Sequence, residues 1–155
     1  MNQPLSRKQC VEAILDATRF AVLATESAGQ PHASLIAFTA VDGWRQLIFA
    51  TYRNTRKYSN LTRNRRVSIL VDGRGLSPAG EPERFVVTAV GQACDLNVDP
   101  HSTMLQAHLH RHPDLAAFLQ SPDCVLLGVV VEAYQLVRGI EDAVWWSADD
   151  LAAAR

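Results

Sequence analysis

The sequence predicts a mainly β fold with inserted helices, in which six antiparallel strands form a closed or partly closed barrel. Three observations lead to this class. Six stretches are rich in apolar and β-branched residues, most of them are joined by short turn sequences, and helical patterns interrupt them at only a few places. Strands and helices do not alternate regularly, which argues against a doubly wound parallel sheet.

The chain is expected to open with a helix and a hairpin. Ser6 and Gln9 have the spacing of a capping box, and apolar residues follow at helical spacing, so we expect a helix over residues 7–18. Residues 20–26 have the composition of a buried strand. The turn sequence SAGQ places Gly29 where a positive φ is needed, and residues 31–41 then form the second strand.

The central part of the chain predicts a second hairpin and a basic helix. Asp42 and Gly43 are a strong hairpin signal that leads into a third strand at residues 46–52. A short basic helix near residues 55–63 can be capped by Asn54 or Thr55. The apolar residues 66–72 then predict the fourth strand.

The last third of the chain predicts two more strands. Residues 73–83 are rich in Gly and Pro and form a loop, and residues 85–96 form a long strand in which Gly91 marks a bulge. Residues 100–120 are helical with an interruption at Pro113, and residues 125–137 are the final strand. A tail with two tryptophans and a short helix at residues 148–154 completes the chain.

Length and composition limit the class of protein. The chain has 155 residues, and we assign residues 1–155 to one domain that can bury a core without metals or disulfides. A net charge of −1 argues against a nucleic-acid-binding surface, and three widely spaced cysteines fit reduced thiols. The N-terminus lacks the apolar run of a secretory signal, and the longest apolar stretch is too short to cross a membrane. We therefore expect a cytoplasmic protein without membrane partners.

The basic helix is the main functional signal. Arg56 and Lys57 lie in its expected first turn, where the amide dipoles already present positive charge. A phosphate would bind the free amides and both side chains at once. The alternative is a solvated basic turn without a ligand.

With these residues in view, the chain resembles the FMN-binding split-barrel proteins related to pyridoxamine 5′-phosphate oxidase. The resemblance runs through FAVLATESAGQPHASLIAF, LIFATYRNTRKYSNL, RRVSILVD and ERFVVTAVGQA, over residues 15–140. Its most specific part is T-x(4)-RK-x-x-N, followed by a strand. Such proteins are six-stranded Greek-key split barrels that form homodimers and bind flavin at the dimer interface.

The resemblance implies a set of cofactor-binding residues. Arg56 and Lys57 would grip the FMN phosphate, Thr51 would donate a hydroxyl to it, and Asn60 would hold the loop or contact the phosphate. The strand backbone at Ala50 would approach the cofactor. Further cofactor-binding positions are Ser34, Leu35 and Ile36 under the flavin ring, and Phe85, where the oxidase has a polar contact.

Two departures from the oxidase stand out. The oxidase has a phosphate-binding arginine early in its second strand, and the nearest candidate here is His32, whose charge depends on pH. The oxidase also has an arginine-rich C-terminal segment for its vitamin B6 substrate, and VWWSADDLAAAR does not match it. The chain is therefore not predicted to oxidise pyridoxamine phosphate.

Other candidate residues carry weaker signals. In the sequence HLHRH, His108 and His112 share a helix face and could bind a metal, but no third ligand is evident, so we predict an exposed helix and no metal site. Heme ligation by one of these histidines is a further option. Of the adjacent Trp145 and Trp146, one is expected in the core or dimer interface, and Trp145 is included as a cofactor-covering candidate.

Three functions remain open at this point. The first is a homodimeric FMN-dependent oxidoreductase with a small-molecule substrate, for which no catalytic side chain can be named. The second is a deazaflavin-dependent reductase, which would use additional basic residues such as Arg63, Arg65 and Arg66. The third is a non-catalytic protein that stores flavin or heme. The sequence does not identify the substrate or the electron acceptor.

Overall fold

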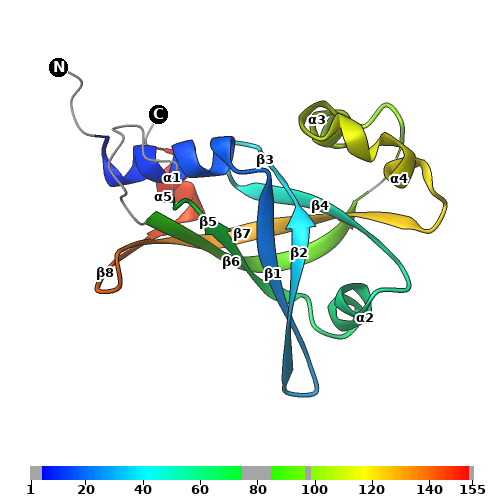
Figure 1. Ribbon diagram of the computed structural model, residues 1–155, viewed down its shortest axis with the longest axis horizontal. Coiled ribbons are helices and arrows are strands. Elements are labelled where there is room, and N and C mark those ends of the chain that lie inside the picture. Colours follow the sequence, from blue (N-terminus) through cyan, green and yellow to red (C-terminus); the bar gives the residue numbers. More distant parts are fainter. Residues whose placement is uncertain (1–4, 75–84, 97–98, 154–155) are drawn as a thin grey trace.

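The computed structural model describes residues 5–74, 85–96 and 99–153. Within them the chain forms one curved antiparallel sheet of eight strands, with the order β2-β1-β5-β6-β7-β4-β3 and with β8 paired to β7. The predicted β class is therefore confirmed (Figure 1). The strands are β1 (Phe20–Ser27), β2 (Gln30–Ala37), β3 (Thr39–Val41), β4 (Gln46–Tyr52), β5 (Arg66–Asp72), β6 (Phe85–Leu96), β7 (Cys124–Arg138) and β8 (Asp142–Ser147).

The long strand β7 organises the sheet. One of its edges pairs with β6 along nearly its full length, while β4 and β8 share the other edge, β4 near the start of β7 and β8 near its end. Strand β2 also packs against β4 without pairing to it, so the sheet curls toward closure but no hydrogen-bonded ladder joins β2 to β4.

The two predicted hairpins are present. The β1–β2 turn has positive φ angles at Ala28 (51°) and Gly29 (80°), as two-residue turns of this kind require. The β3–β4 turn has three successive positive φ angles, at Asp42, Gly43 and Trp44. Trp44 is a bulky residue in this region, and the buried Tyr134 hydroxyl donates a 2.6 Å hydrogen bond to its carbonyl oxygen, which helps to hold the turn.

The structure has two strands that the sequence did not predict. The expected strand at residues 31–41 divides at Phe38, whose amide donates to the carbonyl oxygen of Arg19. Before this point the chain pairs with β1, and after it the chain pairs with β4. Strand β8 was also missed, because its tryptophan pair gives no clear period and only pairing to β7 makes it a strand.

Strand β1 differs from its predicted burial. Residues 20–26 were expected to be buried, but Phe20 and Val22 are 50% and 38% exposed while Ala21 and Leu23 lie in the core. The reason is that the strand has one face on the core and one face outside, although both faces carry apolar side chains.

Gly91 lies in the predicted bulge. The register between β6 and β7 shifts between Val90 and Gly91, and a Cβ atom built on Gly91 would lie 2.1 Å from the carbonyl oxygen of Val130. Only glycine therefore allows the two backbones to approach this closely. The bulge bends β6 and β7 together and so contributes to the curl of the sheet.

The helices cover the ends of the sheet. The predicted capping box of α1 is present, with both reciprocal hydrogen bonds between Ser6 and Gln9. A second group of helices, which we call the helical insert (residues 103–120), covers a small apolar cluster on β4 and β7. The helices are α1 (Arg7–Ala17), α2 (Arg56–Arg63), α3 (Thr103–Arg111), the 3-10 helix η1 (Pro113–Leu115), α4 (Ala116–Gln120) and α5 (Ala148–Ala152).

Two remaining predictions concern the loop and membrane segments. Most of the predicted loop at residues 73–83 lies outside the described residues. Among the helices of the described ranges, none has the length and apolar character needed to cross a bilayer.

Candidate functional site: a pocket between a hairpin and a basic helix

Helix α2 is capped by Thr55, one of the two residues that the sequence analysis named as possible caps. The Thr55 hydroxyl accepts a hydrogen bond from the amide of Tyr58 and also donates to the carbonyl oxygen of Tyr52, at 2.9 Å. Arg56 and Lys57 are the first two helical residues, and the first turn contains no acidic side chain. The leading amides of a helix have no acceptor within the helix, so this end presents positive charge from backbone and side chains together.

Two hydrogen bonds fasten α2 to the β1–β2 hairpin. The buried Asn60 side chain donates to the Thr25 hydroxyl at 3.0 Å, and Asn64 at the end of the helix donates to the Glu26 carboxylate at 2.7 Å. Glu26 also accepts from the amide of Gly29 in the hairpin turn. The hairpin and the helix are therefore held at a fixed separation.

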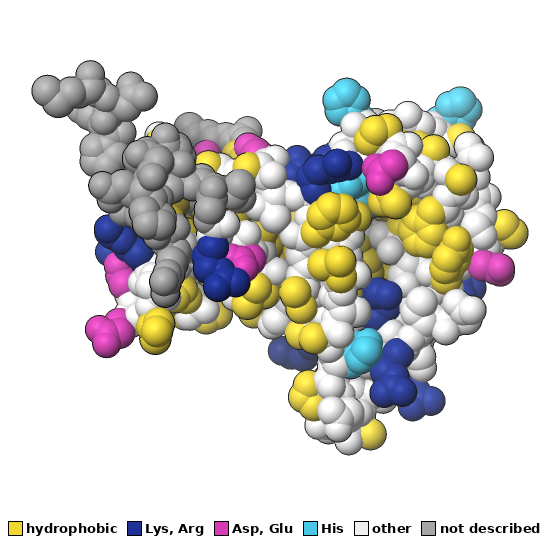
Figure 2. Space-filling view, in the orientation of Figure 1, with side chains coloured by type: hydrophobic (Ala, Val, Ile, Leu, Met, Phe, Trp, Pro, Cys, Tyr) yellow, Lys and Arg dark blue, Asp and Glu magenta, His cyan; other side chains and the backbone are white. Residues whose placement is uncertain are grey.

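A pocket of about 370 Å³ lies between these two elements. It brings together three residues predicted for the site, His32 from β2 and Arg56 and Asn60 from α2. In the same region of Figure 2, Lys, Arg and His side chains gather over α2 beside a band of hydrophobic side chains over β1 and β2. All eight lining residues are polar: Ser27, Gln30, His32, Asn54, Thr55, Arg56, Ser59 and Asn60.

The electrostatics of the pocket favour an anion. Among the ion pairs of the described residues, none involves Arg56 or Lys57. Burial lowers the pKa of the Lys57 ammonium group, because part of its water is removed and no carboxylate replaces it. The carboxylate of Glu26 is engaged by Asn64 and by the amide of Gly29, and these hydrogen bonds, that of Asn64 first, lower its pKa.

Other predicted residues lie behind or beside the pocket. Thr51 is 3% exposed, and its hydroxyl lies 2.9 Å from the hydroxyl of Thr55, so it supports a lining residue rather than lining the pocket itself. Lys57 is half-buried in the first turn of α2 but is not a lining residue. Ala50 packs against the apolar cluster beneath the helical insert.

Strand β2 carries a second group of predicted residues. Ser34 lies on the same face of the strand as His32, and its buried hydroxyl has no hydrogen-bond partner among the described residues. Ile36 continues this face into the core, while Leu35 points to the outer face and is 69% exposed. The polar side chains of His32 and Ser34 therefore lie in a row on one face of β2, between the pocket and the core.

Phe85 and Trp145 lie apart from the pocket. Phe85 packs against the main core, and the Arg138 guanidinium lies over its ring with 5.9 Å between the guanidinium carbon and the ring centroid. Trp145 lies on β8 at 53% exposure, opposite Gln135 of β7. Its neighbour Trp146 packs against the main core, in agreement with the predicted core role of one tryptophan.

Sequence reasoning missed five lining residues: Ser27, Gln30, Asn54, Thr55 and Ser59. Asn54 and Thr55 had been assigned only as possible helix caps, and Ser59 lies one turn beyond Thr55 on the same helix. Ser27 and Gln30 flank the hairpin turn. Only the folding of the hairpin against α2 brings them to the site, so no local pattern identifies them.

The histidine prediction was wrong in one respect. The HLHRH segment was expected to be an exposed helix, yet His108 and His112 are 0% and 1% exposed, and only His110 points to solvent. The described residues contain no group of three or more side chains of the His, Cys, Asp or Glu type that could hold a metal ion.

Comparisons with solved structures bear on the fold. A heme binding protein from Mycobacterium smegmatis has 21% identity and a TM-score of 0.80 over 99% of this chain, which spans only 62% of that protein. A protein from Clostridium acetobutylicum related to general stress protein 26, of the pyridoxinephosphate oxidase family, has 14% identity and a TM-score of 0.71, over 93% of this chain and 96% of that one.

A FAD-binding protein from Mesorhizobium loti has 22% identity and a TM-score of 0.66, over 87% of this chain and 96% of that one. At these identities the likeness concerns the fold alone. No curated protein matches the sequence. The sequence profile described as pyridoxamine 5′-phosphate oxidase matches residues 8–137, which include every strand from β1 to β6 and nearly all of β7. The chain therefore belongs to the pyridoxamine 5′-phosphate oxidase family of split-barrel proteins.

Proposed function

We propose that this chain is an FMN-dependent oxidoreductase that holds the cofactor phosphate in the pocket between the β1–β2 hairpin and α2. The observation that carries the proposal is Arg56, which lies in an entirely polar pocket at the start of a helix without an acid in its first turn. A phosphate there would meet a guanidinium fork, helix amides and hydroxyl groups together.

The residues present fit such a group. Arg56 and Lys57 would balance the phosphate charge, the hydroxyl of Ser59 would donate a hydrogen bond, and His32 would approach from the hairpin side. The unpartnered hydroxyl of Ser34 offers a further polar contact along β2. When bound, the flavin ring supplies the redox chemistry, while the protein positions it and limits its contact with water. We name no acid or base side chain for the reaction.

We also propose that two copies pair through the outer face of β2, β1 and β5. Leu35, Val22 and Leu70 lie directly opposite one another on these strands and are 69%, 38% and 41% exposed. The next row on the same face consists of the small residues Ala33, Ala24 and Ser68, and neither row contains a charge. An uncharged sheet face of this kind is typical of an interface.

Pairing is tested by one charge on this face. Leu35→Lys is expected to convert the dimer to a monomer in sedimentation equilibrium, because the ammonium group would be buried against an apolar partner face. Ile140→Lys is the matched control, since Ile140 is 93% exposed in the β7–β8 turn and away from the proposed face. A monomeric wild type, or a dimer that survives Leu35→Lys, would contradict this interface.

Cofactor binding is tested by comparing ligands that differ in one group. FMN and riboflavin share the ring and ribityl chain, so the ratio of their affinities isolates the phosphate contact. We expect FMN to bind far more tightly, with changes in absorbance and fluorescence on titration. Equal affinities would contradict the phosphate pocket, and saturable binding of deazaflavin or heme in its place would reassign the cofactor.

Catalysis is tested separately from binding. Faster NADPH-dependent reduction of the bound flavin than of free flavin would support an enzyme, and equal rates would favour the storage function. The alternative deazaflavin function depends on the basic residues at the end of α2 and just after it, Arg63, Arg65 and Arg66. There Arg65 pairs with Asp95 at 3.4 Å, while Arg63 and Arg66 are exposed.

The three cysteines form no disulfide, which fits a reducing compartment such as the cytoplasm.

A further inference from the structure

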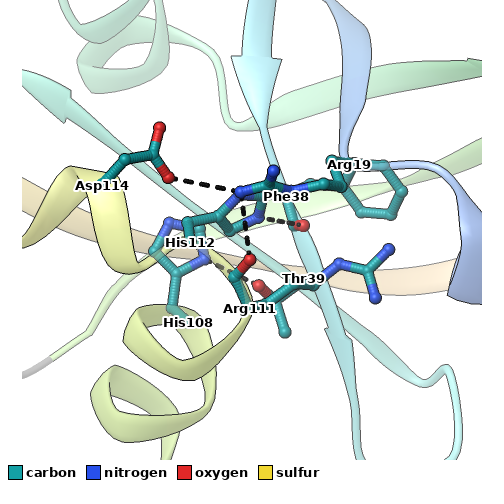
Figure 3. A network of polar contacts seen from close by, with 7 residues as sticks. All are labelled: Arg19, Phe38, Thr39, His108, Arg111, His112 and Asp114. Carbon is teal, nitrogen blue, oxygen red and sulfur yellow. Dashed lines mark hydrogen bonds and ion pairs between the residues drawn. The ribbon is translucent and has the colours of Figure 1, made fainter.

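A pair of buried histidines fastens the helical insert to the sheet. His108 and His112 lie one turn apart on the inner side of α3, with 4.8 Å between their ring centroids. Nδ1 of His108 lies 2.8 Å from the hydroxyl of Thr39, and Nε2 of His112 donates to the carbonyl oxygen of Phe38, also at 2.8 Å (Figure 3). Both imidazoles therefore hold α3 at the point where the chain passes from β2 to β3.

The outer nitrogens of the pair are buried without partners. Within the described residues, Nε2 of His108 and Nδ1 of His112 have no hydrogen-bond partner. Because the Phe38 carbonyl can only accept, the neutral His112 carries its proton on Nε2 and leaves a lone pair on Nδ1. A proton added to either ring would place an N–H group and a positive charge in a site closed to solvent.

The charged groups around the pair oppose such a proton. Arg111 approaches from α3, Arg19 from the junction of α1 and β1, and Asp114 from η1. Asp114 is already bonded to Arg19 at 3.2 Å, so the nearby carboxylate is largely balanced. Asp16 of α1 acts on Arg111 rather than on the rings. Of the charged side chains that act on the rings themselves, two are cations, Arg111 and Arg19, and one is a carboxylate, Asp114, so together they disfavour a further positive charge.

Burial and these cations have the expected effect on titration. Burial first, and then the charges of His112 and Arg111, lower the pKa of His108 to about 4. Burial also lowers the pKa of His112, although its bond to the Phe38 carbonyl acts in the opposite direction. Both rings are thus neutral at pH 7.

The insert that the pair holds covers an apolar cluster. Cys124, at the start of β7, belongs to this cluster and is 3% exposed. It packs with Ile48 and Leu126 from the sheet and with Leu105 and Leu119 from the insert. The reactivity of the Cys124 thiol toward a reagent in solution therefore shows whether the insert covers this part of the sheet.

We propose that His108 and His112 form an acid-sensitive latch, which holds the helical insert on the sheet at neutral pH and releases it when the pair takes up protons. Release would uncover the apolar cluster of β4 and β7 while the rest of the sheet stays paired. This inference does not depend on the proposed cofactor.

Reaction of Cys124 with a dipyridyl disulfide tests the latch, because this reagent also reacts in acid. The other thiols are removed by Cys10→Ala and Cys94→Ser, and rates are divided by those of an unstructured peptide at the same pH. We expect the relative rate to rise about tenfold per pH unit for each proton taken up, as the pH falls below about 6. An unchanged rate down to about pH 4.5 would overturn the proposal.

Two sets of substitutions show whether the histidine pair causes the acid-dependent acceleration of the Cys124 reaction. His108→Asn and His112→Gln together keep an amide nitrogen near the Nδ1 and Nε2 positions but cannot be protonated, so the acid-dependent acceleration should disappear. His110→Gln is the control on the same helix, where the ring is exposed, and it should behave as the wild type. Acceleration in the double variant equal to that of the wild type would show that other groups cause it.

Hydrogen exchange of the unsubstituted protein provides a second measurement if the double variant does not fold. On acidification, amides of α3 and α4 should lose protection while amides of β5 and β6 keep theirs, after correction for the intrinsic rate. Uniform loss across the chain, or no loss in the insert, would contradict a local latch.

Discussion

Two polar clusters of this protein have opposite environments: one lies at α2 beside the β1–β2 hairpin, and the other lies at α3 beside the junction of β2 and β3. The pocket at α2 is open and is lined by Arg56, which has no ion-pair partner among the described residues, whereas the pair at α3 is closed and its rings are bonded to Phe38 and Thr39 at the junction of β2 and β3. Both segments display polar residues at helical spacing in the sequence. The comparison teaches that such spacing shows which residues share a face, but not whether that face meets a ligand or the protein interior.

The largest expected effect concerns the open cluster. Arg56→Ala combined with Lys57→Ala should weaken FMN binding by about 3–6 kcal/mol, since charged hydrogen bonds contribute roughly 1.5–3 kcal/mol each. The free energy of unfolding should change by less than about 0.5 kcal/mol, because neither side chain forms an ion pair among the described residues.

A flavin titration and a urea unfolding curve of the same variant measure both quantities. Arg63→Ala is the control: it removes one positive charge from the last turn of α2, away from the pocket, and should leave FMN binding nearly unchanged. If Arg63→Ala weakens binding as much as the double variant does, the pocket is not the phosphate site and general charge explains the effect.

The next effect concerns the closed cluster and pH. Folding lowers the pKa of His108 from 6.5 to about 4, so the unfolded chain takes up this proton first as the pH falls. The stability contributed by the neutral ring is complete above about pH 6.5 and is lost progressively toward pH 4, by about 3 kcal/mol in total.

Carboxylates also titrate near the acid end of this range, so the useful quantity is the difference between wild type and His108→Asn. Urea unfolding at several pH values should show the wild type losing more stability than the variant between about pH 6.5 and pH 4. Parallel pH dependence of the two proteins would mean that His108 is not perturbed in the folded state.

Thr39→Val tests the buried hydrogen bond of the closed cluster without changing any charge. It removes the hydroxyl beside the buried Nδ1 of His108 and should lower the free energy of unfolding by about 1–3 kcal/mol, while FMN affinity stays unchanged. Thr62→Val is the control, because the Thr62 hydroxyl bonds to the carbonyl of Ser59 on an exposed helix surface. Equal losses in the two variants would assign the effect to the general replacement of a hydroxyl by a methyl group rather than to the buried bond.

The smallest effect concerns the fastening of the pocket. Asn64→Ala removes the hydrogen bond from α2 to Glu26, so the hairpin and helix should be less well positioned and FMN affinity should fall roughly two- to tenfold. The pKa of Glu26 should rise toward its ordinary value, because Asn64 is the main cause of its lowering. Carboxylate NMR titration measures this shift, and an unchanged pKa would show that the bond is absent in solution.

The sequence alone determined features that depend on near neighbours in the chain. The Ser6–Gln9 capping box, the Ala28–Gly29 turn and the first turn of α2 are all local, because their hydrogen bonds and φ angles involve residues within a few positions. The family motif placed Arg56 and Asn60 at one site for the same reason, since one helical turn joins them.

The tertiary structure alone decided which surfaces face each other. Ser27 and Gln30 line the pocket only because β1 and β2 fold against α2, and residues 31–41 form two strands only because their partners change at Phe38. His108 and His112 are buried because the β2–β3 junction covers them. Burial and long-range pairing depend on segments distant in the chain, and no local pattern of residue types encodes which segments will meet.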